Sequence, residues 1–76
     1  MLTIEEAAEA AANFFNAGNI SRLSSPNAFE LVYISQKSDG TPVYYVFNAK
    51  DGQGFIIISA DDKAIPVVGY SETLSL

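Results

Sequence analysis

The apolar positions of the first part of the chain recur at helical spacing. Between residues 2 and 17 they form one stripe, made of Ile4, Ala7, Ala8, Ala11, Phe14 and Phe15. Thr3 and Glu6 have the spacing of a capping box, in which each side chain bonds the free backbone N–H of the other residue. Gly18 suits the end of a helix. The pattern therefore predicts an amphipathic helix over residues 2–17, with its alanines close to a sheet.

After residue 28 the apolar pattern changes to the alternating, β-branched and aromatic composition of strands. It predicts strands over residues 29–35, 43–48, 55–59 and 65–70. Asp51-Gly52 indicates a tight hairpin between the second and third strands. Pro66 has no backbone N–H, so we expect the fourth strand at an edge of the sheet or irregular. The residues after position 70 are expected to fray.

The first strand has apolar residues at both alternating sets of positions. Strict alternation would place Phe29, Leu31 and Tyr33 on one face, and Val32 and Ile34 on the other. Both faces of this strand are therefore partly apolar, and we expect it either to be covered on both sides or to lie next to the helix.

These elements predict an α+β fold, in which one N-terminal amphipathic helix packs on a four-stranded antiparallel meander sheet. The chain has 76 residues, which is the size of a single domain, over residues 1–76. Its hydrophobic fraction of 49% is enough for a core, and because it has no cysteine that core must hold without disulfides. A single helix covers one face of a sheet, so the other face is expected to lack a cover.

The charge balance makes several classes of partner unfavourable. The formal net charge is −5, and the four basic residues are scattered along the chain. Phosphate binding needs clustered cations, so neither nucleic acid nor an anionic membrane surface is an expected partner. The longest apolar run is five residues, which is too short for a membrane span. The N-terminus lacks both the basic region and the long apolar region that a signal peptide has.

The residues available for chemistry are few. The chain has no histidine and, as noted, no cysteine, which excludes Ser-His-Asp and Cys-His catalysis and thiolate or histidine metal sites. Asp61 and Asp62 are neighbours that should point to opposite sides, so we favour a solvated turn over a small enzyme that uses them. A calcium site with Asp51 would need repeated acidic positions that are absent. We therefore expect no catalytic residue, no cofactor and no metal.

The four tyrosines leave two interpretations open. Tyr33, Tyr44, Tyr45 and Tyr70 could form a binding patch on the uncovered face of the sheet, because aromatic residues are enriched at interfaces. They could also be ordinary half-buried strand residues. Composition by itself favours this second interpretation.

Three segments, in this order, resemble the propeptide signature of streptopain-like cysteine proteases: residues 45–48 (YVFN), 54–62 (GFIIISADD) and 66–71 (PVVGYS). The paired phenylalanines of the predicted helix also fit the resemblance. Residues 72–76 (ETLSL) depart from the usual glycine-containing ending of that family.

The resemblance implies a propeptide-like inhibitor that binds a papain-like bacterial cysteine protease of the streptopain type by stoichiometric contact. Such a protein is not an enzyme, is secreted or periplasmic, and is expected to be a monomer when free. The residues expected at the protease interface are Tyr44, Tyr45, Phe47, Asp61, Asp62 and Tyr70. The residues of the motif that are expected to be structural are Gly54, Phe55, Ser59, Pro66 and Gly69.

The alternative interpretation is a cell-envelope interaction module of the PepSY-like kind, which also pairs a helix with an Asp-Gly hairpin and inhibits no protease. Residues 54–62 favour the inhibitor, since the envelope module does not need that run. If the inhibitor interpretation holds, a bulky charged substitution on the exposed face of the sheet, such as Tyr45→Glu, should weaken binding and leave the fold intact. If Gly69 lies at a β-bulge, Gly69→Val should damage folding.

Overall fold

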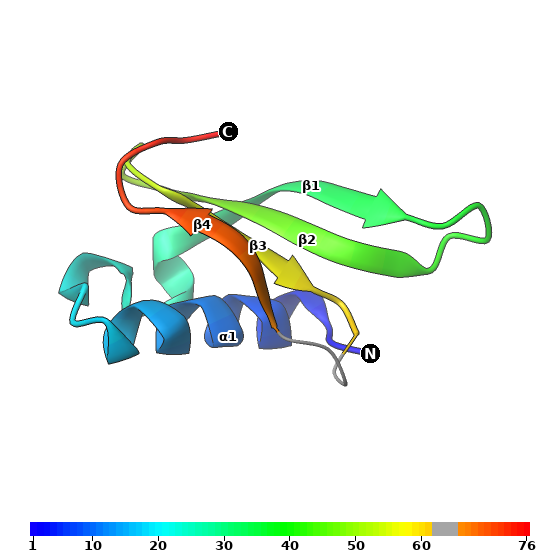
Figure 1. Cartoon of the computed structure of the whole chain (residues 1–76), viewed down its shortest axis with the longest axis horizontal. Helices are drawn as coiled ribbons and strands as arrows, with labels where there is room; N and C mark the ends of the chain where they lie inside the picture. Colours follow the sequence, from blue (N-terminus) through cyan, green and yellow to red (C-terminus); the bar gives the residue numbers. More distant parts are fainter. Residues whose placement is uncertain (62–65) are drawn as a thin grey trace.

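The computed structural model describes residues 1–61 and 66–76 (Figure 1). One helix lies below a four-stranded antiparallel sheet, which confirms the predicted α+β fold. Two short 3₁₀ turns connect the helix to the sheet. The elements in chain order are α1 (Ile4–Ala17), η1 (Ser21–Leu23), η2 (Pro26–Ala28), β1 (Phe29–Gln36), β2 (Pro42–Ala49), β3 (Phe55–Ser59) and β4 (Val67–Ser71).

Helix α1 begins with the predicted capping box. The Thr3 backbone N–H donates to Glu6 Oε1 at 2.9 Å, and the Glu6 backbone N–H donates to Thr3 Oγ1 at 3.1 Å. Gly18 follows the last helical residue, as predicted, but it does not have the left-handed conformation that glycine often adopts there. Gly18 has a φ of −88°, and the left-handed residue after the helix is Asn19, with a φ of 62°. Asparagine adopts this conformation more readily than most residues, because its short amide bonds the local backbone.

The sheet is a meander whose strand order, β1-β2-β3-β4, follows the chain. Strand β3 coincides with the predicted residues 55–59, and β2 begins at Pro42, where the missing N–H is tolerated. The fourth strand was predicted to begin at residue 65, which lies outside the described residues. In the described part, β4 begins directly after Pro66 and forms one edge of the sheet, as expected.

Strand β1 departs from strict alternation. Leu31 pairs with Phe47, but Tyr33 pairs with Val46, so Val32 is an extra residue at a β-bulge. The bulge shifts the later residues of β1 to the opposite sides of the sheet. The prediction that Tyr33 shares a face with Leu31 was therefore wrong. Ile34 shares the helix-facing side with Leu31, and Tyr33 points to the other side.

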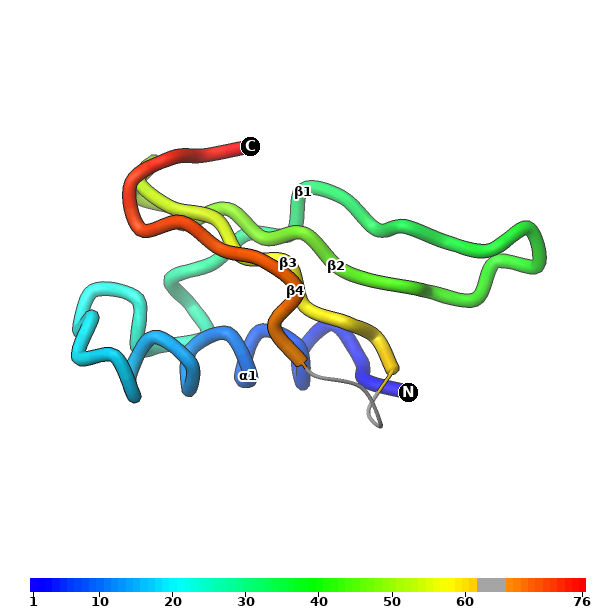
Figure 2. The backbone as a smooth tube through the Cα atoms, in the orientation of Figure 1, coloured from blue at the N-terminus to red at the C-terminus, as the bar shows by residue number. Residues whose placement is uncertain are grey.

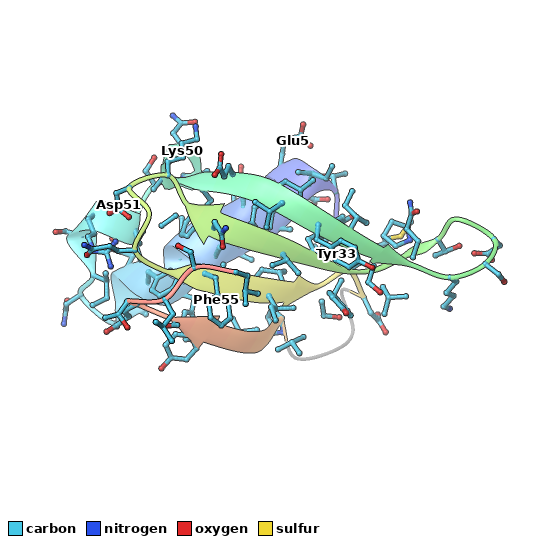
Figure 3. All side chains as sticks on the ribbon, turned by 90° about the horizontal axis from the view of Figure 1, so that it is seen from above. Glu5, Tyr33, Lys50, Asp51 and Phe55 are labelled. Atoms are coloured by element: carbon cyan, nitrogen blue, oxygen red, sulfur yellow. The ribbon has the colours of Figure 1, made fainter. Side chains whose placement is uncertain are left out.

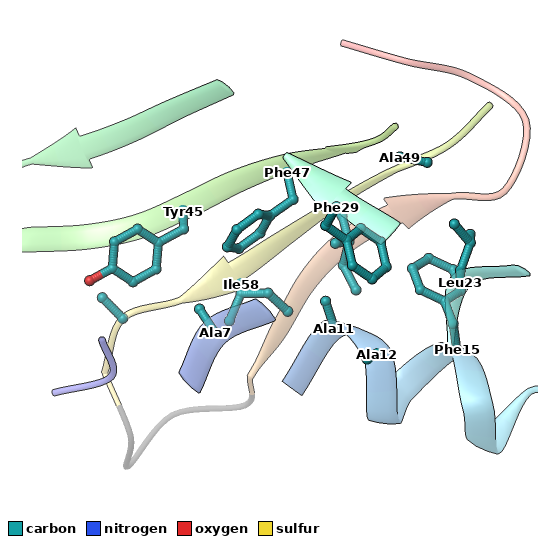
Figure 4. Close-up of a cluster of buried hydrophobic side chains, with 12 residues drawn as sticks. Ala7, Ala11, Ala12, Phe15, Leu23, Phe29, Tyr45, Phe47, Ala49 and Ile58 are labelled. Carbon is teal, nitrogen blue, oxygen red and sulfur yellow. The ribbon is translucent and has the colours of Figure 1, made fainter. Parts of the chain in front are cut away.

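The core lies between α1 and the sheet (Figure 4). It is built from alanines and Phe15 on the helix, and from alternate residues of the strands above them. Small side chains on α1 let the helix approach the larger side chains of the sheet, which is the packing that the alanine stripe predicted. The buried residues with at most 6% exposure on the strands of this side are Phe29, Tyr45, Phe47, Ala49, Ile56 and Ile58.

Both ends of the chain are tied to the sheet. The Leu2 backbone N–H donates to the Ala60 carbonyl at 2.9 Å, and the Tyr45 hydroxyl donates to the Leu2 carbonyl at 2.8 Å. The C-terminal end turns back after β4 and lies on the side of the sheet opposite α1 (Figure 2). The expected fraying of residues 71–76 was wrong, because the Asn48 side chain of β2 and the Gly52 carbonyl of the β2–β3 turn form hydrogen bonds with this segment.

Candidate functional site

The open side of the sheet is the side that faces away from α1. Cross-strand pairing aligns its residues in rows, and the central row runs across all four strands through Tyr33, Val46, Ile57 and Gly69. The remaining residues that alternation places on this side are Glu30, Ser35, Tyr44, Asn48, Phe55, Ser59 and Ser71.

The open side is apolar at its centre and partly accessible. Val46 is only 6% exposed, whereas Tyr33 beside it is 59% exposed. Tyr44, Phe55 and Ile57 are half-buried. No helix or strand of the described residues covers this side, so these aromatic and branched side chains are available to a partner. Figure 3 looks down on this side and labels Tyr33 on β1 and Phe55 on β3.

The C-terminal tail, residues 72–76, covers one end of the open side. The Asn48 side-chain amide donates through Nδ2 to the Leu76 carbonyl at 2.8 Å, and its Oδ1 accepts from the Leu76 N–H at 3.0 Å. The Ser75 hydroxyl donates to the Gly52 carbonyl at 2.8 Å. The Asn48 side-chain amide thus pairs with the backbone of Leu76 in the way that the backbone of a neighbouring strand would. Because the tail covers this end, the accessible part of the open side is the part around Tyr33 and Tyr44.

Arg22 joins three segments that are distant in sequence. Its Nη1 donates to Asp51 Oδ2 at 2.7 Å, and its Nη2 donates to the Glu72 carbonyl. The Gln53 backbone N–H, followed by the Arg22 guanidinium, lowers the pKa of the Asp51 carboxyl below its ordinary value. Both side chains of the ion pair are partly exposed, so solvent weakens their attraction. The contact fixes the β2–β3 turn against the tail.

The glycine at the base of this turn allows the tail to pass closely. Gly54 has a φ of +136°, and a Cβ atom there would lie 3.0 Å from the Ser71 carbonyl oxygen. A side chain at this position would therefore be strained and would also push the tail away.

The family model described as Spi protease inhibitor matches residues 1–76. The chain belongs to this family, the streptopain propeptide and inhibitor family. The predicted resemblance is thereby confirmed, and membership implies a protease as the partner and suggests an inhibitor rather than an enzyme. No curated protein and no solved structure matches the chain.

Two of the residues predicted for the interface of this Spi-family chain lie in the core. Tyr45 and Phe47 are 3% and 2% exposed, and they point toward α1 with Ile56 and Ile58. The expectation that Tyr45 lies on the exposed face was wrong. Neighbouring residues of a strand point to opposite sides, and the sequence does not say which of Tyr44 and Tyr45 faces the helix. Tyr44 is the one on the open side.

The other predicted interface residues are divided among different places. Tyr70 is 51% exposed at the β4 edge, where its ring lies edge-on to Phe14 with centroids 4.7 Å apart. Asp61 is exposed, and its backbone N–H donates to Ser59 Oγ at 3.2 Å. Asp62 lies outside the described residues. The structure does not bring the five described residues together on one surface, and the role of all six in binding stays a prediction.

The residues predicted to be structural occupy positions of several kinds. Gly54 shows the clearest backbone requirement, as described above. Phe55 and Ser59 lie on the open side at the two ends of β3. Pro66 donates no N–H but its carbonyl accepts from the Ser59 N–H at 2.7 Å. Gly69 lies next to a bulge in β4, yet an added Cβ would meet only Ile57 Cδ1, at an ordinary 3.9 Å.

Two contacts of the open side were not predicted, the Asn48 pair with the tail and the Arg22 contact. Both join residues far apart in the sequence, and no local pattern marks them. Among the described residues there is no group of three or more acidic, histidine or cysteine side chains that could hold a metal ion. Within the same residues no helix is long and apolar enough to cross a bilayer.

Proposed function

We propose that the chain inhibits a papain-like bacterial cysteine protease of the streptopain type by stoichiometric contact through the open side of its sheet. Membership in the Spi protease inhibitor family carries this proposal. It also supports action outside the cytoplasm, in the periplasm or the medium. An inhibitor of this kind needs a stable surface and no catalytic group, because it acts by occupying its target.

The open side supports the proposed binding mode. A standard interface buries about 800 Å² on each partner, and the domain exposes 4596 Å² in total. Tyrosine is enriched among interface residues that contribute most to affinity, since it combines a large apolar ring with a polar group. Tyr33 and Tyr44 are the accessible tyrosines of this side.

The net charge of −5 supports a role for electrostatic attraction in association. Charges outside the contact mainly change the rate at which two proteins meet, and salt screens them. Against a protease with a basic surface, the association rate should fall as salt is added, while the dissociation rate should change little. A rate that does not depend on salt would contradict this part of the proposal.

The direct test is a titration of the domain into a streptopain-like protease while peptide hydrolysis is followed. We expect activity to fall linearly to zero near one equivalent. Tyr33→Ala should weaken inhibition by about tenfold or more, whereas Asn13→Ala, on the exposed side of α1, should leave it unchanged. Absence of inhibition and of binding at tens of micromolar would contradict the proposed target. Equal inhibition by the wild type and Tyr33→Ala would instead contradict the proposed surface.

A further inference from the structure

The helix-facing side of the sheet is not fully covered. Helix α1 packs mainly on β2 and β3, and the part of this side that belongs to β1 is left with a groove of about 320 Å³. We call it the α1–β1 groove. Its apolar walls come from both elements: Ile4 and Ala8 on α1, and Phe29 and Leu31 on β1.

The exposure of these residues shows how the groove arises. Ile4 and Ala8 belong to the apolar stripe that the sequence predicts for the core, yet Ile4 is 40% exposed and Ala8 is only half-buried. Leu31 is also half-buried, whereas Phe29 is 6% exposed and forms the packed floor. The apolar stripe of the helix is thus wider than the surface that covers it, and the uncovered part lines the groove.

The rim of the groove is acidic. Glu5 and Glu9 line it from α1, one helical turn apart, and both are exposed. Within the described residues neither side chain has an ion pair or a hydrogen bond. Figure 3 shows Glu5 on the β1 side of the molecule. Lys50 lies on this side too, but it belongs to the β2–β3 turn and does not line the groove.

We propose that the α1–β1 groove binds a partner segment in which one large apolar side chain is flanked by lysine or arginine. The apolar side chain would cover Ile4, Ala8 and Leu31, and the basic side chains would meet Glu5 and Glu9. A volume near 300 Å³ is at the small end for ligand sites and suits a single side chain. A second copy of the chain does not suit the groove, because it would bring two acidic rims together.

This surface is separate from the open side, so the proposal does not depend on protease inhibition. The test is a titration of the ¹⁵N-labelled domain with the peptide acetyl-Gly-Lys-Leu-Lys-Gly-amide, followed by NMR. We expect saturable shifts at the amides of Ala8 and Leu31, with half-saturation on the order of 1 mM. The corresponding peptide with glutamates in place of lysines should give no shifts. Raising the salt concentration from about 50 to 500 mM should weaken binding several-fold.

Variants assign the binding to the groove. Glu9→Lys should weaken binding about fivefold or more, since it places a like charge on the rim. Glu72→Lys makes the same change of charge in the C-terminal tail and should have little effect. Ile4→Ala removes apolar wall without changing charge and should also weaken binding.

Four results would overturn the proposal. One is the absence of shifts at several millimolar peptide, and another is shifts confined to residues outside the groove. The third is equal weakening by Glu9→Lys and Glu72→Lys, which would indicate attraction to net charge alone. Shifts of the groove amides on raising the domain concentration without peptide would identify a second copy as the occupant, and would likewise contradict the proposal.

Discussion

The two sides of the sheet are built from the same strands but differ in how far their side chains are buried. The side that faces α1 is closed at its centre, where Tyr45 and Phe47 of β2 and Ile56 and Ile58 of β3 are at most 6% exposed. The open side has one residue buried to that degree in its central row, Val46, next to a tyrosine that is 59% exposed. Alternation thus lets each strand bury one set of residues in the core and leave the other set on the side that we propose as the binding surface.

Neighbouring tyrosines give the largest contrast between the two sides. Tyr45→Glu would bury a charge beside Phe47 and remove the hydrogen bond to the Leu2 carbonyl. We expect a loss of more than about 4 kcal/mol in the free energy of unfolding, enough to unfold a domain of this size. Tyr44→Glu, on the open side, should leave the chain folded and weaken inhibition. Circular dichroism of both variants checks this. A folded Tyr45→Glu variant would contradict the expected difference between the two sides.

Two phenylalanines, one on each side of the sheet, should give a smaller difference in stability than the two tyrosines. Phe47 is 2% exposed on the closed side, while Phe55 is half-buried on the open side. Truncation of a buried phenylalanine costs about 3–5 kcal/mol, because the apolar contacts are lost and a cavity remains. Phe47→Ala should therefore lose at least twice as much stability as Phe55→Ala in urea unfolding. Equal losses would mean that the open side contributes to the core as much as the closed side does.

The C-terminal tail covers one end of the open side. Substitutions of two glycines test how much stability depends on the close approach of the chain at Gly54. Gly54→Ala forces a left-handed backbone on alanine and a 3.0 Å contact with the Ser71 carbonyl. Strain of this kind costs about 1–3 kcal/mol. Gly69→Ala meets only an ordinary contact and should change stability by less than about 1 kcal/mol. Thermal unfolding of the pair checks the order, and a larger loss for Gly69→Ala would contradict it.

Gly69 also shows which features of the fold the sequence predicts and which it does not. Gly69→Val was expected to damage folding if position 69 lay at a bulge, and Gly69 does lie beside one. An added Cβ atom meets only an ordinary contact there, so alanine fits, and the damage expected from valine stays a prediction. Thr3, Glu6 and the Asp51-Gly52 turn were predictable because the interactions are local. The bulge at Val32 was not, because an apolar residue fits either side of a strand. The pairing of Asn48 with Leu76 was not either, since it depends on how the whole chain folds.

The smallest expected effect concerns the ion pair between Arg22 and Asp51. The folded-state pKa of Asp51 is lowered, so its contribution to stability is complete above the unfolded value of about 3.9 and is lost as the pH falls through the folded value. Asp51→Asn should therefore make the melting temperature slightly less sensitive to acid between about pH 5 and pH 2.5. Arg22→Met should reduce the same sensitivity only in part, since the Gln53 N–H still bonds Asp51.

A double-mutant cycle of these two positions is the control for the ion pair. The two substitutions should not be additive, because each removes the same contact. Additive effects, or an unchanged acid sensitivity in Asp51→Asn, would show that the contact with Arg22 does not hold the tail against the open side.

The order of the strands has a kinetic consequence. Each strand pairs with the strand next to it in the chain, so every step of sheet formation closes only a short loop. The entropy cost of closure grows with the length of the loop, and chains dominated by local pairing fold quickly. Within the part of the chain that the structure describes, the hydrogen bond that spans the most residues joins Leu2 to Ala60. The meander can therefore assemble before the beginning of the chain arrives, and docking of α1 completes the folding reaction.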